Sequence, residues 1–87
     1  MEKNITSSYK SPKNRYRASL FFSEALDFGN TTSFTAMSLD DLHWRVAAEV
    51  NRHRATGHRE LTAEVTVYEN KDTYPKFDWV EIEKYTI

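Results

Sequence analysis

Cationic side chains gather between residues 45 and 59. Two histidines and one glutamate accompany four arginines there, Arg45, Arg52, Arg54 and Arg59. Guanidinium groups can bind phosphates and stack on nucleobases. Residues 60–87, however, carry seven acids against three lysines, and the net charge of the chain is −1. Nucleic-acid-binding domains usually carry a clear excess of positive charge, which this chain lacks. Nucleic-acid binding through this basic helix edge is therefore our alternative hypothesis and not our first.

The sequence contains no recognisable nucleophile motif. The chain has no cysteine, no Gly-x-Ser-x-Gly motif and only two glycines, too few for a phosphate-binding loop. Glu81 and Glu83 are two residues apart, so both should lie on one side of a strand, as a pair of catalytic carboxylates could. Charges that protect an edge strand from aggregation explain this pair more simply. We expect no catalytic residue and no enzyme.

His53 and His58 are the main candidates for metal ligands. They lie on either side of the expected helix end, and a shared metal would need a third ligand such as Glu60. Histidine near a helix C-terminus more simply balances the helix dipole, and we expect His58 to face solvent. The sequence therefore predicts no metal site and no cofactor.

The stretch from Ser38 to Gly57 predicts the one long helix, over about 38–56. Ser38 is suited to be the N-cap, and Asp41 three residues later gives a variant of the capping box. Basic residues precede Gly57, which can adopt the left-handed conformation that ends a helix.

One face of this helix is apolar. Helical spacing brings Leu39, Leu42, Val46 and Val50 together as the core face. Trp44 falls near the opposite side, which predicts a second layer or a partner over its indole. Arg45 and Arg52 flank Trp44 on the helix surface.

Alternating polar and apolar residues predict four strands, over 15–26, 31–37, 61–68 and 77–87. Asp27 to Asn30 supply the first hairpin turn, and 70–75 supply the second. The alternation slips in the last strand, which a β-bulge near Trp79 would explain.

These elements predict an α+β fold with the order ββαββ, a four-stranded and mainly antiparallel sheet with the helix on one face. The other face would lack a helix to cover it. We expect it to carry Arg17, Phe21, Thr66 and Tyr68, with either Trp79 or Tyr85. The residues expected to bind a partner are Trp44, Arg45, Arg52, Phe21, Tyr68 and Trp79.

The N-terminal residues and the composition predict the domain organisation and the location of the protein. Residues 1–14 are polar and aperiodic, which predicts a flexible tail before a single domain over 15–87. No apolar run has the length of a membrane span and no signal peptide is recognisable, so we expect a cytoplasmic protein. The absence of cysteine is compatible with a reducing compartment.

The function expected from these features is binding without catalysis. We expect a small regulatory, inhibitory or adaptor protein that binds another protein or a copy of itself, most simply as a homodimer. By analogy of type alone, small cysteine-free proteins of this kind are common among phage and mobile-element accessory proteins.

Overall fold

The computed structural model describes residues 15–71 and 78–87 of the 87-residue chain. The elements follow the order ββαββ that the sequence predicts. Their bounds are β1 Tyr16–Leu26, β2 Gly29–Ala36, α2 Leu39–Ala55, β3 Ala63–Asn70 and β4 Trp79–Thr86. The predicted tail over 1–14 and the predicted start of the last strand at Phe77 lie outside the described residues.

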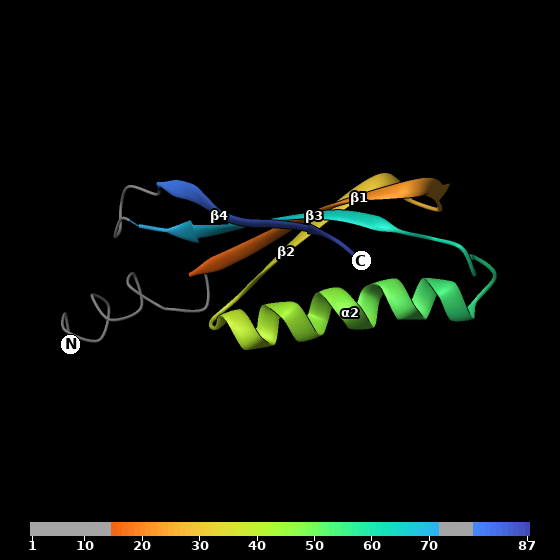
Figure 1. Cartoon of the computed structure of the whole chain (residues 1–87), viewed down its shortest axis with the longest axis horizontal. Helices are drawn as coiled ribbons and strands as arrows, with labels where there is room; N and C mark the ends of the chain where they lie inside the picture. Colours follow the sequence, from red (N-terminus) through yellow and green to blue (C-terminus); the bar gives the residue numbers. More distant parts are fainter. Residues whose placement is uncertain (1–14, 72–77) are drawn as a thin grey trace, which may run out of the picture.

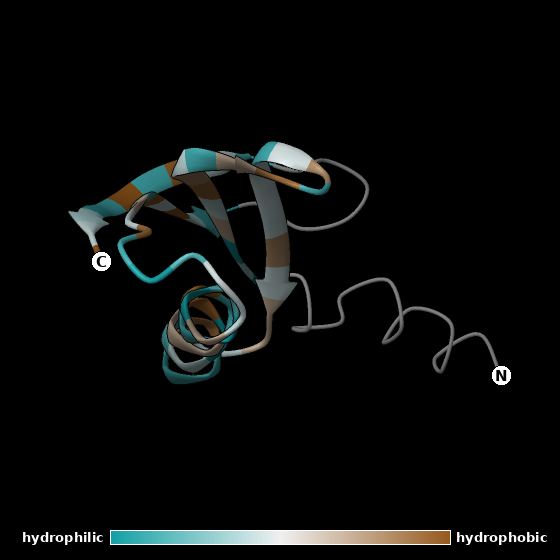
Figure 2. Cartoon of the chain, turned by 90° about the vertical axis from the view of Figure 1, so that its right-hand side faces the viewer, coloured by the Kyte–Doolittle hydropathy of each residue, from teal (hydrophilic) through white to brown (hydrophobic). Residues whose placement is uncertain are grey.

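The four strands form one antiparallel sheet in the order β2-β1-β3-β4. The chain leaves β2 at one edge, runs through α2 along one face of the sheet and enters β3 on the far side of β1 (Figure 1). Seen end-on, α2 lies to one side of the sheet (Figure 2). The α+β fold predicted from the alternation of polar and apolar residues is therefore confirmed.

The core lies between α2 and the two central strands. Ala18, Leu20 and Phe22 of β1 pair with Val67, Val65 and Ala63 of β3, and all six side chains are buried. Leu42, Val46 and Val50 of the helix are buried as well, as the helical spacing predicts. The alternating apolar side chains of the two strands thus point toward the apolar face of the helix.

Local chemistry ends the helix on both sides. The Ser38 hydroxyl accepts a hydrogen bond from the Asp41 N–H at 3.1 Å. Gly57 has a φ of 119°, and the His58 N–H donates to the His53 carbonyl at 3.1 Å, the long bond of a Schellman motif. Within the described residues, no helix is both long and apolar enough to cross a membrane.

The bulge in β4 lies three residues beyond the predicted position at Trp79. Val67 pairs with Glu83 and Tyr68 with Glu81, so Ile82 has no opposite residue. Paired residues of an antiparallel sheet point to the same face. Glu83 therefore lies on the helix side with Val67, and Glu81 lies on the open side with Tyr68. The expectation that Glu81 and Glu83 share one side was wrong, because the extra residue between them reverses the alternation.

The N-cap can be tested by changing its acceptor. Ser38→Ala should lower the free energy of unfolding by about 1 kcal/mol, because the Asp41 N–H loses its partner. Ser38→Asp keeps an acceptor and should retain the stability of the original protein within a few tenths of a kcal/mol. Urea unfolding followed by circular dichroism measures both. Equal losses in the two variants would mean that the hydroxyl oxygen does not act as the cap.

Candidate functional site

The face of the sheet opposite α2 is the first candidate surface, and we call it the sheet face. The register places on it the residues that alternate with the core, among them Arg17 and Phe21 of β1, Tyr68 of β3, and Trp79 and Glu81 of β4. No helix of the described chain covers this face. Phe21 is 54% exposed although it sits in a central strand. Tyr85, the alternative to Trp79 in the sequence reading, packs against the core instead.

Arg17 joins the aromatic side chains of this face. Its guanidinium carbon lies 5.1 Å from the centre of the Tyr68 ring and 4.9 Å from that of Trp79. A cation over an aromatic ring is attracted by the negative face of the π-system. The Arg17 Nε is buried and has no hydrogen-bond partner among the described residues. The contacts with the two rings therefore position this guanidinium.

Charges on the sheet face are balanced. Arg17 and Lys84 supply the cations, and Glu64 and Glu81 supply the anions, because the register directs all four away from the helix. Phosphate-binding surfaces depend on an excess of cations. Aromatic residues and arginine are the types enriched in the cores of protein interfaces. The sheet face thus combines balanced charge with residue types that are enriched in protein interfaces.

The outer side of α2 is the second candidate surface, and we call it the helix face. Trp44 is 72% exposed there, and Ala48, Asn51 and Ala55 at helical spacing are also exposed. Because the core side of α2 packs on the sheet, the helix face points away from it. The six predicted partner-binding residues therefore do not form one site: Phe21, Tyr68 and Trp79 lie on one side of the molecule, and Trp44 lies on the other.

The four arginines of the basic stretch do not form one cluster either. Arg45 donates to the Thr35 carbonyl at 2.8 Å and lies over the Phe34 ring, and Arg52 donates to Glu49 at 2.9 Å. Arg54 donates to the Leu61 carbonyl at 2.8 Å and so anchors the loop before β3. Arg59 is exposed, and its side chain forms no hydrogen bond or ion pair with the described part of the chain. Three of the four guanidinium groups thus stabilise the fold itself.

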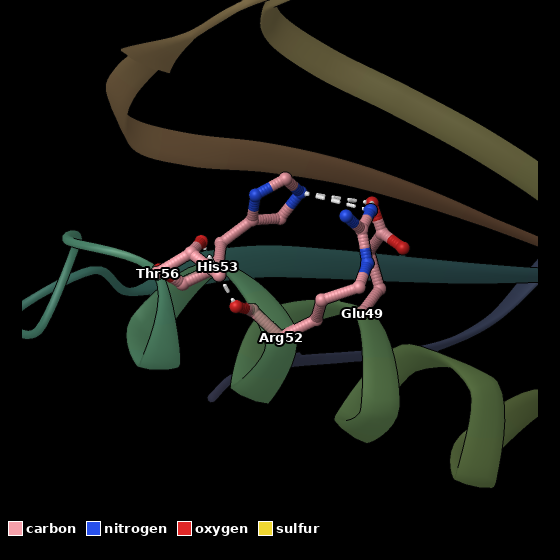
Figure 3. Close-up of polar contacts among 4 residues, drawn as sticks. All are labelled: Glu49, Arg52, His53 and Thr56. Atoms are coloured by element: carbon pink, nitrogen blue, oxygen red, sulfur yellow. Dashed lines mark hydrogen bonds and ion pairs between the residues drawn. The ribbon is translucent and has the colours of Figure 1, made fainter.

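A polar cluster joins the end of α2 to the first hairpin. The His53 side chain is only 12% exposed, and its Nε2 lies 3.0 Å from the Glu49 carboxylate, which Arg52 also contacts (Figure 3). The His53 ring packs edge-on against Phe22 and Phe28. The i, i+4 spacing of Glu49 and His53 was the signal in the sequence that could have indicated this pair.

His58 and His43 also bind carboxylates. The Nδ1 of His58 lies 2.7 Å from Glu24 and the side chain is 33% exposed, so His58 faces solvent only in part and has a partner that the sequence did not predict. The Nε2 of His43 lies 2.7 Å from Glu83 of β4. These partners are 34 and 40 residues away in sequence, so only the folded chain brings them together.

Metal binding at the helix end gains no geometric support. The rings of His53 and His58 are near each other, with centres 6.4 Å apart, but each holds a different glutamate. Among residues 15–71 and 78–87, no three side chains of the metal-binding types come together. The histidines act here as structural hydrogen-bond partners.

The Glu49 carboxylate and the Tyr85 phenol are among the groups with a shifted pKa. Burial raises the pKa of Glu49, but hydrogen bonds from Arg52 and His53 outweigh it, so that the pKa lies below its ordinary value. Burial, with a smaller contribution from the Glu83 carboxylate, raises the pKa of Tyr85.

Comparisons with models of protein families, with curated proteins and with solved structures found no match to this chain. The functional argument therefore rests on the surfaces described above.

The Glu49 cluster predicts a dependence of stability on pH. The pKa of Glu49 is lower in the folded chain than its ordinary value of 4.5, so its stabilisation is complete above pH 4.5 and is lost as the pH falls through the folded-state pKa. Glu49→Gln should lower the free energy of unfolding by about 1 kcal/mol near neutral pH. The difference from the original protein should narrow in acid.

Urea unfolding at a series of pH values measures this difference. Glu64→Gln, which neutralises an exposed carboxylate on the sheet face, is the control and should change stability by less than about 0.5 kcal/mol. The free energy of unfolding of Glu49→Gln should approach that of the original protein in acid. A difference that stays constant from neutral pH into acid would contradict the lowered pKa of Glu49.

Proposed function

We propose that this protein is a non-catalytic protein-binding module and that the sheet face is its recognition surface. The observation that carries the proposal is an open sheet face on which Phe21 is exposed and Arg17, four residues earlier in β1, lies over the Tyr68 and Trp79 rings. Exposed aromatic groups of this kind gain free energy when a partner removes them from water.

Order within the surface supports recognition. The Arg17 guanidinium lies over two rings, and β1 and β3 each have a hydrogen-bonded strand on both sides, so the surface is formed before a partner arrives. A preformed surface loses little side-chain entropy on binding. Balanced charges on the same face favour a partner of mixed charge over a polyanion.

The two opposite surfaces favour an adaptor role among the regulatory functions. A protein that covers the sheet face cannot also cover Trp44, because the sheet and the helix separate them. The helix face then stays available for a second molecule. One chain of this size can in this way hold two partners at once.

The recognition surface can be tested with Phe21 and a residue of equal exposure. Phe21→Ser should weaken partner binding at least tenfold, as expected when a central aromatic contact is removed. Met37→Ser is the matched control, because Met37 is 55% exposed but lies outside the sheet face, between β2 and α2. It should leave the affinity unchanged.

The partner for this measurement can be obtained by placing a photo-crosslinking phenylalanine analogue at position 21 in the producing cells. The crosslinked partner is then identified by mass spectrometry, produced separately without the crosslink, and titrated by calorimetry against the original protein, both serine variants and Trp44→Ala. An affinity lost equally in Phe21→Ser and Met37→Ser, or lost in neither, would contradict recognition by the sheet face. An unchanged affinity in Trp44→Ala supports separate surfaces.

Nucleic-acid binding through Arg45, Arg52, Arg54 and Arg59 is the second candidate, favoured by the exposure of Arg52 and Arg59. Each phosphate contact should contribute about 0.7–0.9 to the slope of log affinity against log salt. Arg52→Ala combined with Arg59→Ala removes two cations and spares the carbonyl contacts of Arg45 and Arg54.

Gel shifts at rising salt, with single-stranded and duplex probes, decide between the two candidates. Our proposal predicts that the double variant does not change the salt dependence of any complex with nucleic acid. A steep slope that falls by about 0.7–0.9 per arginine removed would establish the nucleic-acid function instead.

A further inference from the structure

The open edge of β2 presents a defined set of backbone groups. The Ser23 N–H donates to the Thr62 carbonyl at 2.9 Å, and the Asn70 N–H donates to the Arg15 carbonyl at 2.8 Å. In an antiparallel pair, hydrogen-bonded and non-bonded residues alternate. Odd-numbered residues of β1 therefore bond to β3, and even-numbered residues bond to β2.

The pairing of β1 with β2 then determines which groups of β2 are free. Tyr16, Ala18 and Leu20 are opposite Ala36, Phe34 and Thr32 and bond to them. The intervening residues of β2 direct their N–H and C=O groups away from the sheet, and they are Thr31, Ser33 and Thr35. The Arg45 guanidinium, which reaches the Thr35 carbonyl from the helix, agrees with this assignment.

The two edges of the sheet differ in their protection. β4 carries the bulge at Ile82 and the charged residues Glu81 and Lys84, which hinder the addition of another strand. β2 reads Gly-Asn-Thr-Thr-Ser-Phe-Thr-Ala, with no charge and no proline, and pairs regularly from Thr31 to Ala36. A regular, uncharged edge is suited to strand addition.

We propose that this edge binds a second copy of the chain, with β2 antiparallel to β2 about a two-fold axis at Ser33. In this register Thr31 faces Thr35 of the second copy, Ser33 faces its own equivalent, and every edge N–H of these residues meets a carbonyl. The free N–H and C=O groups of the edge are thus complementary to those of a second copy, and no like charges within β2 are brought together because the strand is uncharged. A two-fold interface requires such self-complementarity.

The side chains around the edge fit this arrangement. On the helix side, the half-buried Phe34 faces Thr32 of the second copy, which removes more of its ring from water. Arg45 can remain in place because a carbonyl oxygen has two lone pairs and can accept two hydrogen bonds. The dimer has one continuous eight-stranded sheet and joins two sheet faces side by side, which goes beyond recognition by a single face.

Charges introduced at the two-fold axis test the dimer. Ser33 is exposed, so Ser33→Lys and Ser33→Glu leave the core intact. Sedimentation equilibrium should find the original protein dimeric and each variant alone monomeric, because two like charges then face each other. An equimolar mixture of the two variants should form dimers again. Thr86→Lys on the opposite edge is the control and should remain dimeric.

Hydrogen exchange of individual amides locates the interface. The N–H groups of Thr31, Ser33 and Thr35 should exchange slowly in the original protein and at least tenfold faster in Ser33→Lys. A protein that is monomeric at about 1 mM, at the weak end of protein affinities, overturns the proposal. So does a dimer that survives Ser33→Lys, or one whose three edge amides exchange rapidly, as pairing through the sheet face would give. None of these variants alters Phe21, so the proposed recognition surface is tested separately.

Discussion

One amphipathic helix packed across two central strands is the constraint on which this molecule depends. Leu42, Val46 and Val50 of α2 bury the apolar residues of β1 and β3, and together they form the core. A single helix covers only one face of a four-stranded sheet. The opposite face must therefore be stabilised by its own side chains or by another molecule, and the functional argument begins from that requirement.

The sheet face meets the requirement in part through cation–π contacts. The Arg17 guanidinium lies over the Tyr68 and Trp79 rings, so it is attracted to both π-systems. The bulge at Ile82 makes this possible because it turns Trp79 and Glu81 to the sheet face while Tyr85 packs on the core side. Phe21 remains exposed farther along β1 on the same face. The same local irregularity thus protects the β4 edge and completes the candidate recognition surface.

Ionisable side chains on the helix side mainly hold the elements together. Each of the three histidines binds a glutamate, and these pairs connect α2 with β4, the helix end with the first hairpin, and adjacent turns of α2. Arg45 and Arg54 bind backbone carbonyls on opposite sides of the helix. Residues that resembled a phosphate-binding cluster in the sequence are consequently distributed over several structural contacts.

Local patterns in the sequence determined the elements, the caps at Ser38 and Gly57, the core face of the helix and the exposure of Trp44. These features depend on residues within about one or two turns of each other, where spacing alone decides which side chains share a face. The order of the strands, the position of the bulge and the partners of His43 and His58 were decided by the tertiary structure. They depend on residues tens of positions apart, such as His43 and Glu83, which come together only when β4 pairs with β3 above the helix. The separation of Trp44 from Phe21 has the same origin, because only the packed sheet and helix place the two side chains on opposite sides of the molecule.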